Sequence, residues 1–155
     1  MSNTTALGID VGSATTKLVA VDPSGTIVAH WLEETEPRIE EQTARMIEGG
    51  REGNTKIPVV TTGYGRKLVA GSGKSVTEIT CHAKGVHAAI GQAGTLIDIG
   101  GQDSKVIVLS KSGRVVDFAM NDKCAAGTGR FLENTAARLK LPLEEMSEAA
   151  LSTTE

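Results

Sequence analysis

GIDVGSATTKLVAVDPSGTIVAHW, residues 8–31, and LIDIGGQDSKVIVLSKSGRVVDFA, residues 96–119, align without a gap at a constant offset of 88 residues. Identical residues meet at Ile9/Ile97, Asp10/Asp98, Gly12/Gly100, Lys17/Lys105, Ser24/Ser112, Gly25/Gly113 and Val28/Val116. In each copy, apolar stretches are separated by two glycine turns, which is typical of a three-stranded β-meander. The alignment indicates a duplicated unit, and a chance similarity between two short hairpins is the less favoured explanation.

After the first meander the apolar spacing becomes helical. Thr35 is predicted to cap a helix that ends at Gly49-Gly50. Its apolar face comprises Ile39, Thr43, Met46 and Ile47. KIPVVTTG (56–63) then predicts a short buried strand, YGRKLVAG (64–71) a short helix, and EITCHAKGVHAAIG (78–91) a second helix closed by Gly91.

The second unit begins with β-β-β at about residue 94 and continues into helices at 128–140 and after Pro142. It has 62 residues, from 94 to 155, for a unit whose first copy, β-β-β-α-β-α-α, occupies residues 3–91. We therefore expect an incomplete second unit, in a fragment or in a protein whose missing elements come from elsewhere. The predicted domains are residues 1–92 and 93–155, in an α/β fold.

Composition excludes several classes of protein. The 155 residues carry a formal net charge of −3 and no basic run, which argues against general nucleic-acid binding. The polar N-terminus lacks the apolar core of a secretory signal, and no apolar run approaches the ~20 residues of a membrane span. Cys81 and Cys124 are therefore expected to be reduced thiols of a cytoplasmic protein.

A carboxylate ends a strand in each copy, two residues before a turn glycine: Asp10 before Gly12 and Asp98 before Gly100. Without a Cβ, these glycines and Gly101 let the backbone approach a ligand and aim N–H groups at an anion. Hydroxyl donors follow at Ser13, Thr15, Thr16 and Ser104. A single Asp-Gly turn is weak evidence, but its duplication predicts two phosphate loops that face each other across a pseudo-twofold cleft. Asp10 and Asp98 are then placed to bind a hydrated Mg²⁺ or to orient an attacking water.

GIDVGSATTK (8–17) and DIGGQDSK (98–105) resemble the phosphate-1 and phosphate-2 loops of the superfamily of acetate kinase, sugar kinases, Hsp70 and actin. Together with TTGYGR, EITCHAKG and NDKCAAGTGRF, they are similar to the ATP-dependent activators of 2-hydroxyacyl-CoA dehydratases. That group includes the ATPase subunits of benzoyl-CoA reductases. The resemblance covers essentially the whole chain and implies an actin-like, ribonuclease H-like ATPase fold of duplicated βββαβα units.

The resemblance also implies an activity. Such activators are homodimers that hold one 4Fe–4S cluster between their subunits. ATP binding and hydrolysis drive a low-potential electron onto the metal centre of the dehydratase or reductase, and ferredoxin or flavodoxin is the expected electron donor. By the same resemblance, the residues around the ATP phosphates are Gly12, Ser13, Ala14, Thr15, Thr16 and Lys17 on one side and Gly100, Gly101, Gln102 and Asp103 on the other.

Some of these roles stay open. Gln102 positions the hydrolytic water, or it is a turn residue with its amide in solvent. Asp103 binds Mg²⁺, or it caps the turn. Lys17 and Lys105 can equally be solvated strand residues.

The motif NDKCAAGTGRF (121–131) places Cys124 just before a predicted helix, where unpaired N–H groups and the positive dipole end stabilise a thiolate or an anionic cluster. A catalytic thiol also suits this position, but it needs a base, and none of the three histidines of the sequence has a readable relation to Cys124. By the resemblance, Cys124 is a ligand of the 4Fe–4S cluster. Cys81, followed by His82 on a predicted helix, is interpreted as a small buried residue.

One cysteine per chain does not hold such a cluster in the usual way, because the family uses two from each subunit. The second cysteine and the adenosine-binding part of the cleft are expected downstream of Glu155, so we expect this chain alone to bind ATP weakly or not at all. Two other functions stay open: a phosphotransferase of the sugar-kinase type, for which no acceptor-binding insertion is found, and a non-catalytic nucleotide-binding module.

Overall fold

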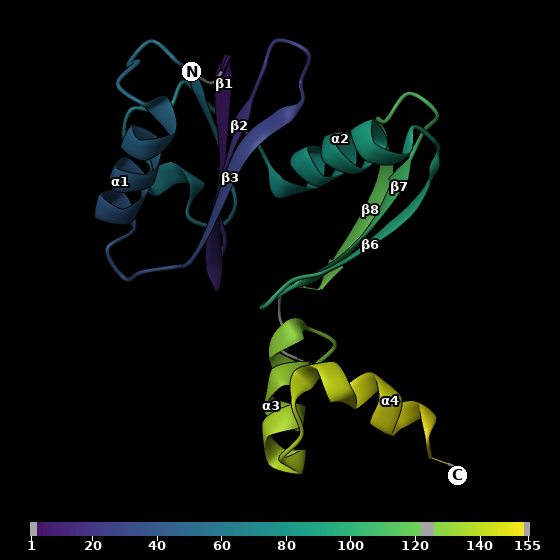
Figure 1. Ribbon diagram of the computed structural model, residues 1–155. Coiled ribbons are helices and arrows are strands. Elements are labelled where there is room, and N and C mark those ends of the chain that lie inside the picture. Colours follow the sequence, from purple (N-terminus) through teal and green to yellow (C-terminus); the bar gives the residue numbers. More distant parts are fainter. Residues whose placement is uncertain (1–2, 122–125, 154–155) are drawn as a thin grey trace. The chain divides into compact units, whose positions relative to one another are not determined.

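The computed structural model describes residues 3–121 and 126–153, and it divides into two compact units, Met1–His82 and Ala83–Glu155. Figure 1 shows the elements of both units in sequence colours. The first unit contains β1 (Ala6–Val11), β2 (Thr15–Val21), β3 (Ile27–Glu34), α1 (Ile39–Arg51), β4 (Val59–Thr62) and β5 (Lys74–Ser75). The helix α2 (Glu78–Ile90) begins in the first unit and ends in the second. The predicted domains, 1–92 and 93–155, stay a prediction.

The first unit is built on a five-stranded sheet in the order β3-β2-β1-β4-β5. The strands β1, β2 and β3 are antiparallel, and β4 and β5 run parallel to β1. Burial alternates along β1 and β2, so every second residue faces the core. The carboxyl ends of β1, β4 and β5 consequently lie at the same edge of this sheet.

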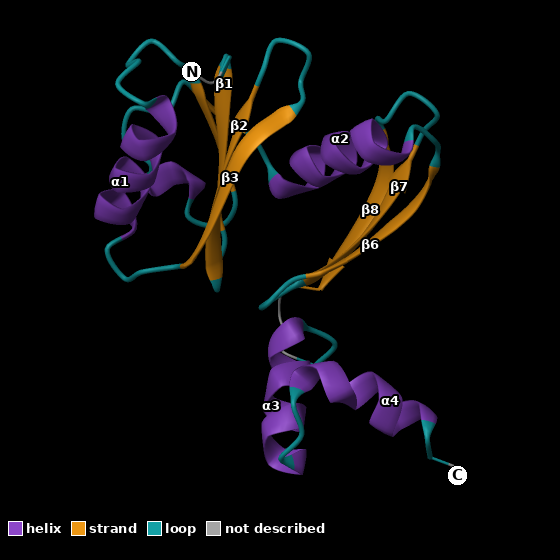
Figure 2. Cartoon of the chain, in the orientation of Figure 1, coloured by secondary structure: helices purple, strands orange, loops and turns teal. Residues whose placement is uncertain are grey.

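The helix α1 covers one face of that sheet, as Figures 1 and 2 show. The predicted apolar face is confirmed: Thr43, Met46 and Ile47 are buried, and Ile39 packs against the core. The core that they join comprises Leu7, Ile9, Val11, Leu18, Ala20, Ile57, Val59 and Val69. An apolar stripe at helical spacing therefore meets the apolar face of an alternating sheet.

Both predicted ends of α1 are wrong. Thr35 does not cap the helix, because its hydroxyl donates to the Gly12 carbonyl at 2.8 Å, and the residue before the helix is Arg38. The helix also continues through Gly50, where a Cβ would lie 2.8 Å from Leu18 Cδ2. Gly50 therefore allows a close approach of helix to sheet, and the helix ends at Arg51, before Glu52 in the left-handed region with φ 48°.

The remaining elements of the first unit follow the predicted order, with one strand missed. KIPVVTTG forms β4, and the short helix after it is a 3₁₀ turn at Arg66–Leu68. The two-residue strand β5 was not predicted, because Lys74–Ser75 has neither apolar residues nor alternation. The helix α2 is closed by Gly91 with φ 75°, as expected.

The second unit contains the antiparallel sheet β6-β7-β8, with β6 (Gly94–Ile99), β7 (Ser104–Leu109) and β8 (Val115–Asn121). It continues into α3 (Gly129–Leu139), a 3₁₀ turn at Leu143–Glu145 and α4 (Met146–Leu151). His87 of α2 lies against the β7–β8 turn, where a Cβ on Gly113 would lie 2.4 Å from the imidazole ring. In the described part of the chain, no helix has the length and apolar character needed to cross a membrane.

The predicted duplication of the meanders is confirmed down to single hydrogen bonds. The Gly12 N–H donates to the Thr15 carbonyl at 3.1 Å, and at the same offset the Gly100 N–H donates to the Asp103 carbonyl at 2.8 Å. The second turns of the two meanders are closed by equivalent backbone hydrogen bonds. Both meanders also carry a register shift at equivalent positions, Ala20/Val21 and Val108/Leu109. The two copies therefore share one backbone pattern.

Candidate functional site

The first glycine loop connects β1 to β2 and places a carboxylate beside a lysine. Asp10 and Lys17 are paired residues of the two strands, and Lys17 Nζ lies 3.3 Å from Asp10 Oδ2. The same ammonium donates to the Thr15 carbonyl at 3.3 Å, and 43% of the Lys17 side chain is exposed. The pair is therefore open to solvent, and Lys17 can turn toward an anion at the loop.

The second loop, between β6 and β7, buries its lysine instead. Lys105 Nζ lies 3.3 Å from Asp98 Oδ2 and 2.8 Å from Asp103 Oδ1, and only 4% of its side chain is exposed. Lys105 is thus not a solvated strand residue. Because a Cβ on Gly100 would lie 2.6 Å from Asp103 Oδ1, the loop closes this tightly only with glycine there.

Hydroxyls at the start of β2 and β7 anchor the chain that follows each meander. Thr16 is fully buried, and its hydroxyl shares a hydrogen bond of 3.0 Å with Thr35. Ser104, the equivalent residue, donates to the Gly127 carbonyl at 2.5 Å. The other expected ligand residues are partly buried (Gly12, Ser13, Thr15 and Gly101) or exposed (Ala14 and Gln102).

The start of α3 is bound to the second loop. The Gly129 N–H donates to the Gly100 carbonyl at 2.8 Å, and the Arg130 N–H donates to the Gly101 carbonyl at 3.3 Å. The expectation of unpaired N–H groups at this helix start is therefore wrong for these two residues, because carbonyls of the loop already accept from them. Cys124 itself lies outside the described residues.

The expected metal ligands differ in availability. Asp98 and Asp103 share the buried Lys105, whereas Asp10 has an exposed lysine that can move. Within residues 3–121 and 126–153, no three His, Cys, Asp or Glu side chains gather closely enough to hold a metal ion. In proteins, Mg²⁺ commonly takes one or two carboxylate ligands and completes its shell with substrate phosphates and water. Asp10 fits that arrangement best.

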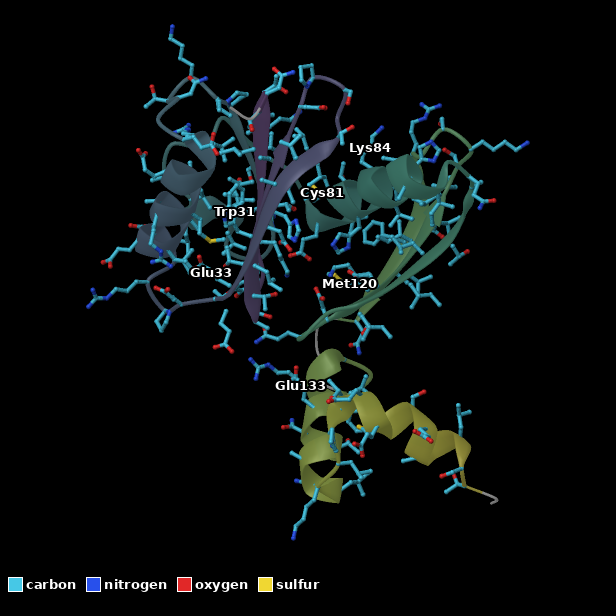
Figure 3. The ribbon with its side chains drawn as sticks, viewed as in Figure 1. Trp31, Glu33, Cys81, Lys84, Met120 and Glu133 are labelled. Atoms are coloured by element: carbon cyan, nitrogen blue, oxygen red, sulfur yellow. The ribbon has the colours of Figure 1, made fainter. Side chains whose placement is uncertain are left out.

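Cys81 is partly buried on α2, so its interpretation as a buried small residue is only partly correct. Figure 3 shows Cys81 on this helix.

Glu33 lies on β3, as does Trp31, and both are labelled in Figure 3. Hydrogen bonds from the side chains of Gln42, which has the largest effect, and Arg45 hold the pKa of Glu33 below its ordinary value. These contacts tie α1 to the end of β3.

One segment that lies against the first loop was predicted only as a glycine turn and as part of the motif TTGYGR, without a role at the site. The end of β4, with Thr62, Gly63 and Gly65, lies against the end of β1. Gly63 has φ 91°, and a Cβ there would lie 2.5 Å from Asp10 Oδ1. The available signal was a pair of glycines directly after a buried strand, which marks a close approach of backbone.

With this geometry established, comparisons with known proteins define the family. The sequence profile of the BadF/BadG/BcrA/BcrD ATPase family matches residues 7–155, and the chain belongs to this family. It is 44% identical over 147 residues to the activator of lactoyl-CoA dehydratase of Anaerotignum propionicum, covering 92% of this chain and 56% of that protein. It is also 37% identical over 153 residues to the (R)-2-hydroxyglutaryl-CoA dehydratase activating ATPase of Acidaminococcus fermentans, covering 96% and 58%.

The solved structure of a relative has a similar fold. The activator of the 2-hydroxyisocaproyl-CoA dehydratase from Clostridium difficile with bound ADPNP superposes with a TM-score of 0.83 at 36% identity, covering 97% of this chain and 57% of that one. The motif resemblance and the expected actin-like α/β fold are thereby confirmed. The chain spans a little more than half the length of the relatives it matches.

Proposed function

We propose that this chain, as a member of the BadF/BadG/BcrA/BcrD ATPase family, is the phosphate-binding part of an ATP-dependent activator. The activator would be a homodimer that binds ATP and Mg²⁺ and carries one 4Fe–4S cluster with Cys124 as a ligand. Hydrolysis of ATP would drive a low-potential electron, received from a ferredoxin or flavodoxin, onto a 2-hydroxyacyl-CoA dehydratase or a related acyl-CoA reductase. Two relatives named as activators, each at least 37% identical, support this class of partner.

Two observations support nucleotide binding by the loops. Each loop begins with a glycine next to a carboxylate that is paired with a lysine. The N–H groups of Gly12 and Gly100 are themselves used inside the loops, by the Thr15 and Asp103 carbonyls, contrary to the expectation that they are aimed at an anion. Phosphoryl transfer relies on positioning and on neutralisation of charge, which such loops provide. The related activator with 36% identity has ADPNP bound.

The electron-transfer proposal rests mainly on two backbone hydrogen bonds between the second loop and α3. The carbonyls of Gly100 and Gly101 accept from the first two residues of the helix that follows the Cys124 segment. A phosphate that shifts this loop would shift the helix start with it. Bound Mg²⁺ would supply neutralisation of the phosphate charge, and Asp10 would orient its water shell.

Anaerobic purification of the complete gene product tests the proposal. We expect iron and acid-labile sulfide, absorbance near ~400 nm, and ATP-dependent reduction of a partner dehydratase. Cys124→Ser should abolish the cluster, whereas Cys81→Ser, the matched control on α2, should retain it. A colourless protein without iron would contradict the activator function, and ATP hydrolysis that requires a sugar would favour the sugar-kinase function instead.

A further inference from the structure

The hydroxyl of Thr62 is buried without a hydrogen-bond partner among the described residues. It lies at the carboxyl end of β4, the middle of the three parallel strands of the first unit. Folding removes such a hydroxyl from water without giving it a new hydrogen bond. The hydroxyl therefore lowers the stability of the fold, unless a ligand supplies the missing hydrogen bond. In open sheets with parallel strands, ligands bind outside the carboxyl ends of the strands.

Register and burial place Thr62 beside Asp10. The two residues are paired in the parallel ladder between β1 and β4. Their neighbours Ile9 and Thr61 are buried on the face that α1 covers, so Asp10 and Thr62 share the opposite face. Lys17 is on that face as well, because it pairs with Asp10 across the β1–β2 ladder.

The chain after Thr62 fixes this arrangement. A Cβ on Gly63 would meet the Val11 carbonyl and the Asp10 carboxylate, and the Gly65 N–H donates to the Val11 carbonyl at 2.9 Å. The Arg66 guanidinium donates to the Gly63 carbonyl at 2.9 Å and holds the turn. Thr62 is therefore held next to the carboxylate by a turn that accepts only glycine at Gly63.

We infer that Thr62 is a binding residue of the nucleotide site, whose hydroxyl pairs with an oxygen held next to Asp10. This oxygen belongs either to the terminal phosphate of ATP or to the water that lies against it. The inference rests on the proposed function. It adds the end of β4 to the candidate binding residues that the first glycine loop supplies at the end of β1.

Thr62→Val in the complete gene product tests this inference, because valine keeps the shape and removes only the hydroxyl. We expect the midpoint of thermal unfolding to stay equal or to rise, while the rate of ATP hydrolysis falls by about 10- to 100-fold. Thr62→Ser, which keeps a hydroxyl, should restore most of the rate. A purely structural threonine would show the reverse, with lower stability and unchanged hydrolysis.

Affinity measurements distinguish the two sources of the oxygen. If it belongs to the terminal phosphate, Thr62→Val weakens binding of ADPNP about tenfold and leaves ADP unchanged. If it belongs to the water, both affinities stay unchanged and only the rate falls.

Thr61→Val is the matched control, since it makes the same change one residue away on the opposite face. Its hydroxyl lies 3.5 Å from the Lys74 carbonyl, so we expect an effect on stability and none on the rate. Wild-type hydrolysis and ADPNP affinity in Thr62→Val would overturn the inference while the proposed function stands. A wild-type protein that binds no ATP would overturn both.

Discussion

The two meanders have the same backbone hydrogen bonds and very different surroundings. Ile9 of the first copy is 1% exposed under α1, and Ile97, its equivalent, is 68% exposed. The lysines are reversed, since Lys17 is solvated and Lys105 is buried. Local sequence thus determines strands, turns and register, whereas burial depends on what packs against each meander, as α1 does against the first.

The largest expected effect comes from the same truncation in both copies. Ile9→Ala should lower the free energy of unfolding by about 3 kcal/mol, because it leaves a cavity under α1. Ile97→Ala should change it by less than about 0.5 kcal/mol. Urea unfolding followed by fluorescence of Trp31, the only tryptophan, reports the first unit, and circular dichroism reports the whole chain. Equal losses in the two variants would contradict the difference in burial.

For the loop lysines the second copy should be the more sensitive one, so that removal of Lys105 destabilises the protein more than removal of Lys17. Lys105→Met leaves the Asp98 and Asp103 carboxylates without their buried cation, and we expect a loss of about 2–3 kcal/mol. Lys17→Met removes a solvated pair worth about 0–1 kcal/mol. Urea unfolding of both variants measures the two losses. A larger loss from Lys17→Met than from Lys105→Met would contradict the difference in burial between the two lysines.

The second turns of the meanders give a smaller contrast. Gly25 and Gly113 both have positive φ, 83° and 69°, but only Gly113 lies against another side chain, that of His87. Gly25→Ala should cost about 1 kcal/mol from backbone strain alone, and Gly113→Ala about 2 kcal/mol because His87 must also move. The difference should shrink in a His87→Ala background, where only the Cβ of residue 87 stays 2.8 Å from the added Cβ, and an unchanged difference would contradict the contact.

The smallest effect depends on pH. Asp22 Oδ1 accepts from the Ser24 hydroxyl and from two backbone N–H groups, and these bonds, first that of the Ser24 side chain, hold the pKa of Asp22 below its ordinary value. The equivalent acceptor in the second copy is the neutral Ser110 hydroxyl, which accepts from the Arg114 N–H.

Because the folded pKa is lowered, the stabilisation by Asp22 is complete above the unfolded value of about 3.9 and is lost as pH falls through the folded value. An NMR titration should move the Thr26 amide with a midpoint below about 3.9 and leave the Arg114 amide unchanged. A midpoint at or above the ordinary value would contradict the turn geometry.

Sequence predicted the features that depend on local pattern. The duplication, the meanders, the apolar face of α1 and the closure of α2 at Gly91 follow from periodicity and glycine placement. The start of α1 was misjudged because Thr35 bonds to Gly12, 23 residues away in the chain. Its end was misjudged because Gly50 serves contact with Leu7 and Leu18. Such distant contacts leave no local pattern.

The site shows the same division. Gly12, Gly100 and both aspartates were predicted as candidates from the pattern, because each repeats at the same offset. Thr62 was not among the predicted candidates, since only the parallel pairing of β1 with β4 brings it beside Asp10. The burial of Lys105 was not predicted either. The sequence around it differs from that around Lys17 by a carboxylate, Asp103 in place of Thr15, and an added carboxylate does not by itself predict burial.

The contact between α3 and the second loop has a geometric consequence for the loop itself. A trans peptide group is planar, and its C=O and N–H point in opposite directions. With the carbonyls of Gly100 and Gly101 held by the first amides of α3, the N–H groups of Gly101 and Gln102 must point away from the helix. The contact with α3 thus fixes the orientation of two neighbouring N–H donors of the loop in the absence of an anion.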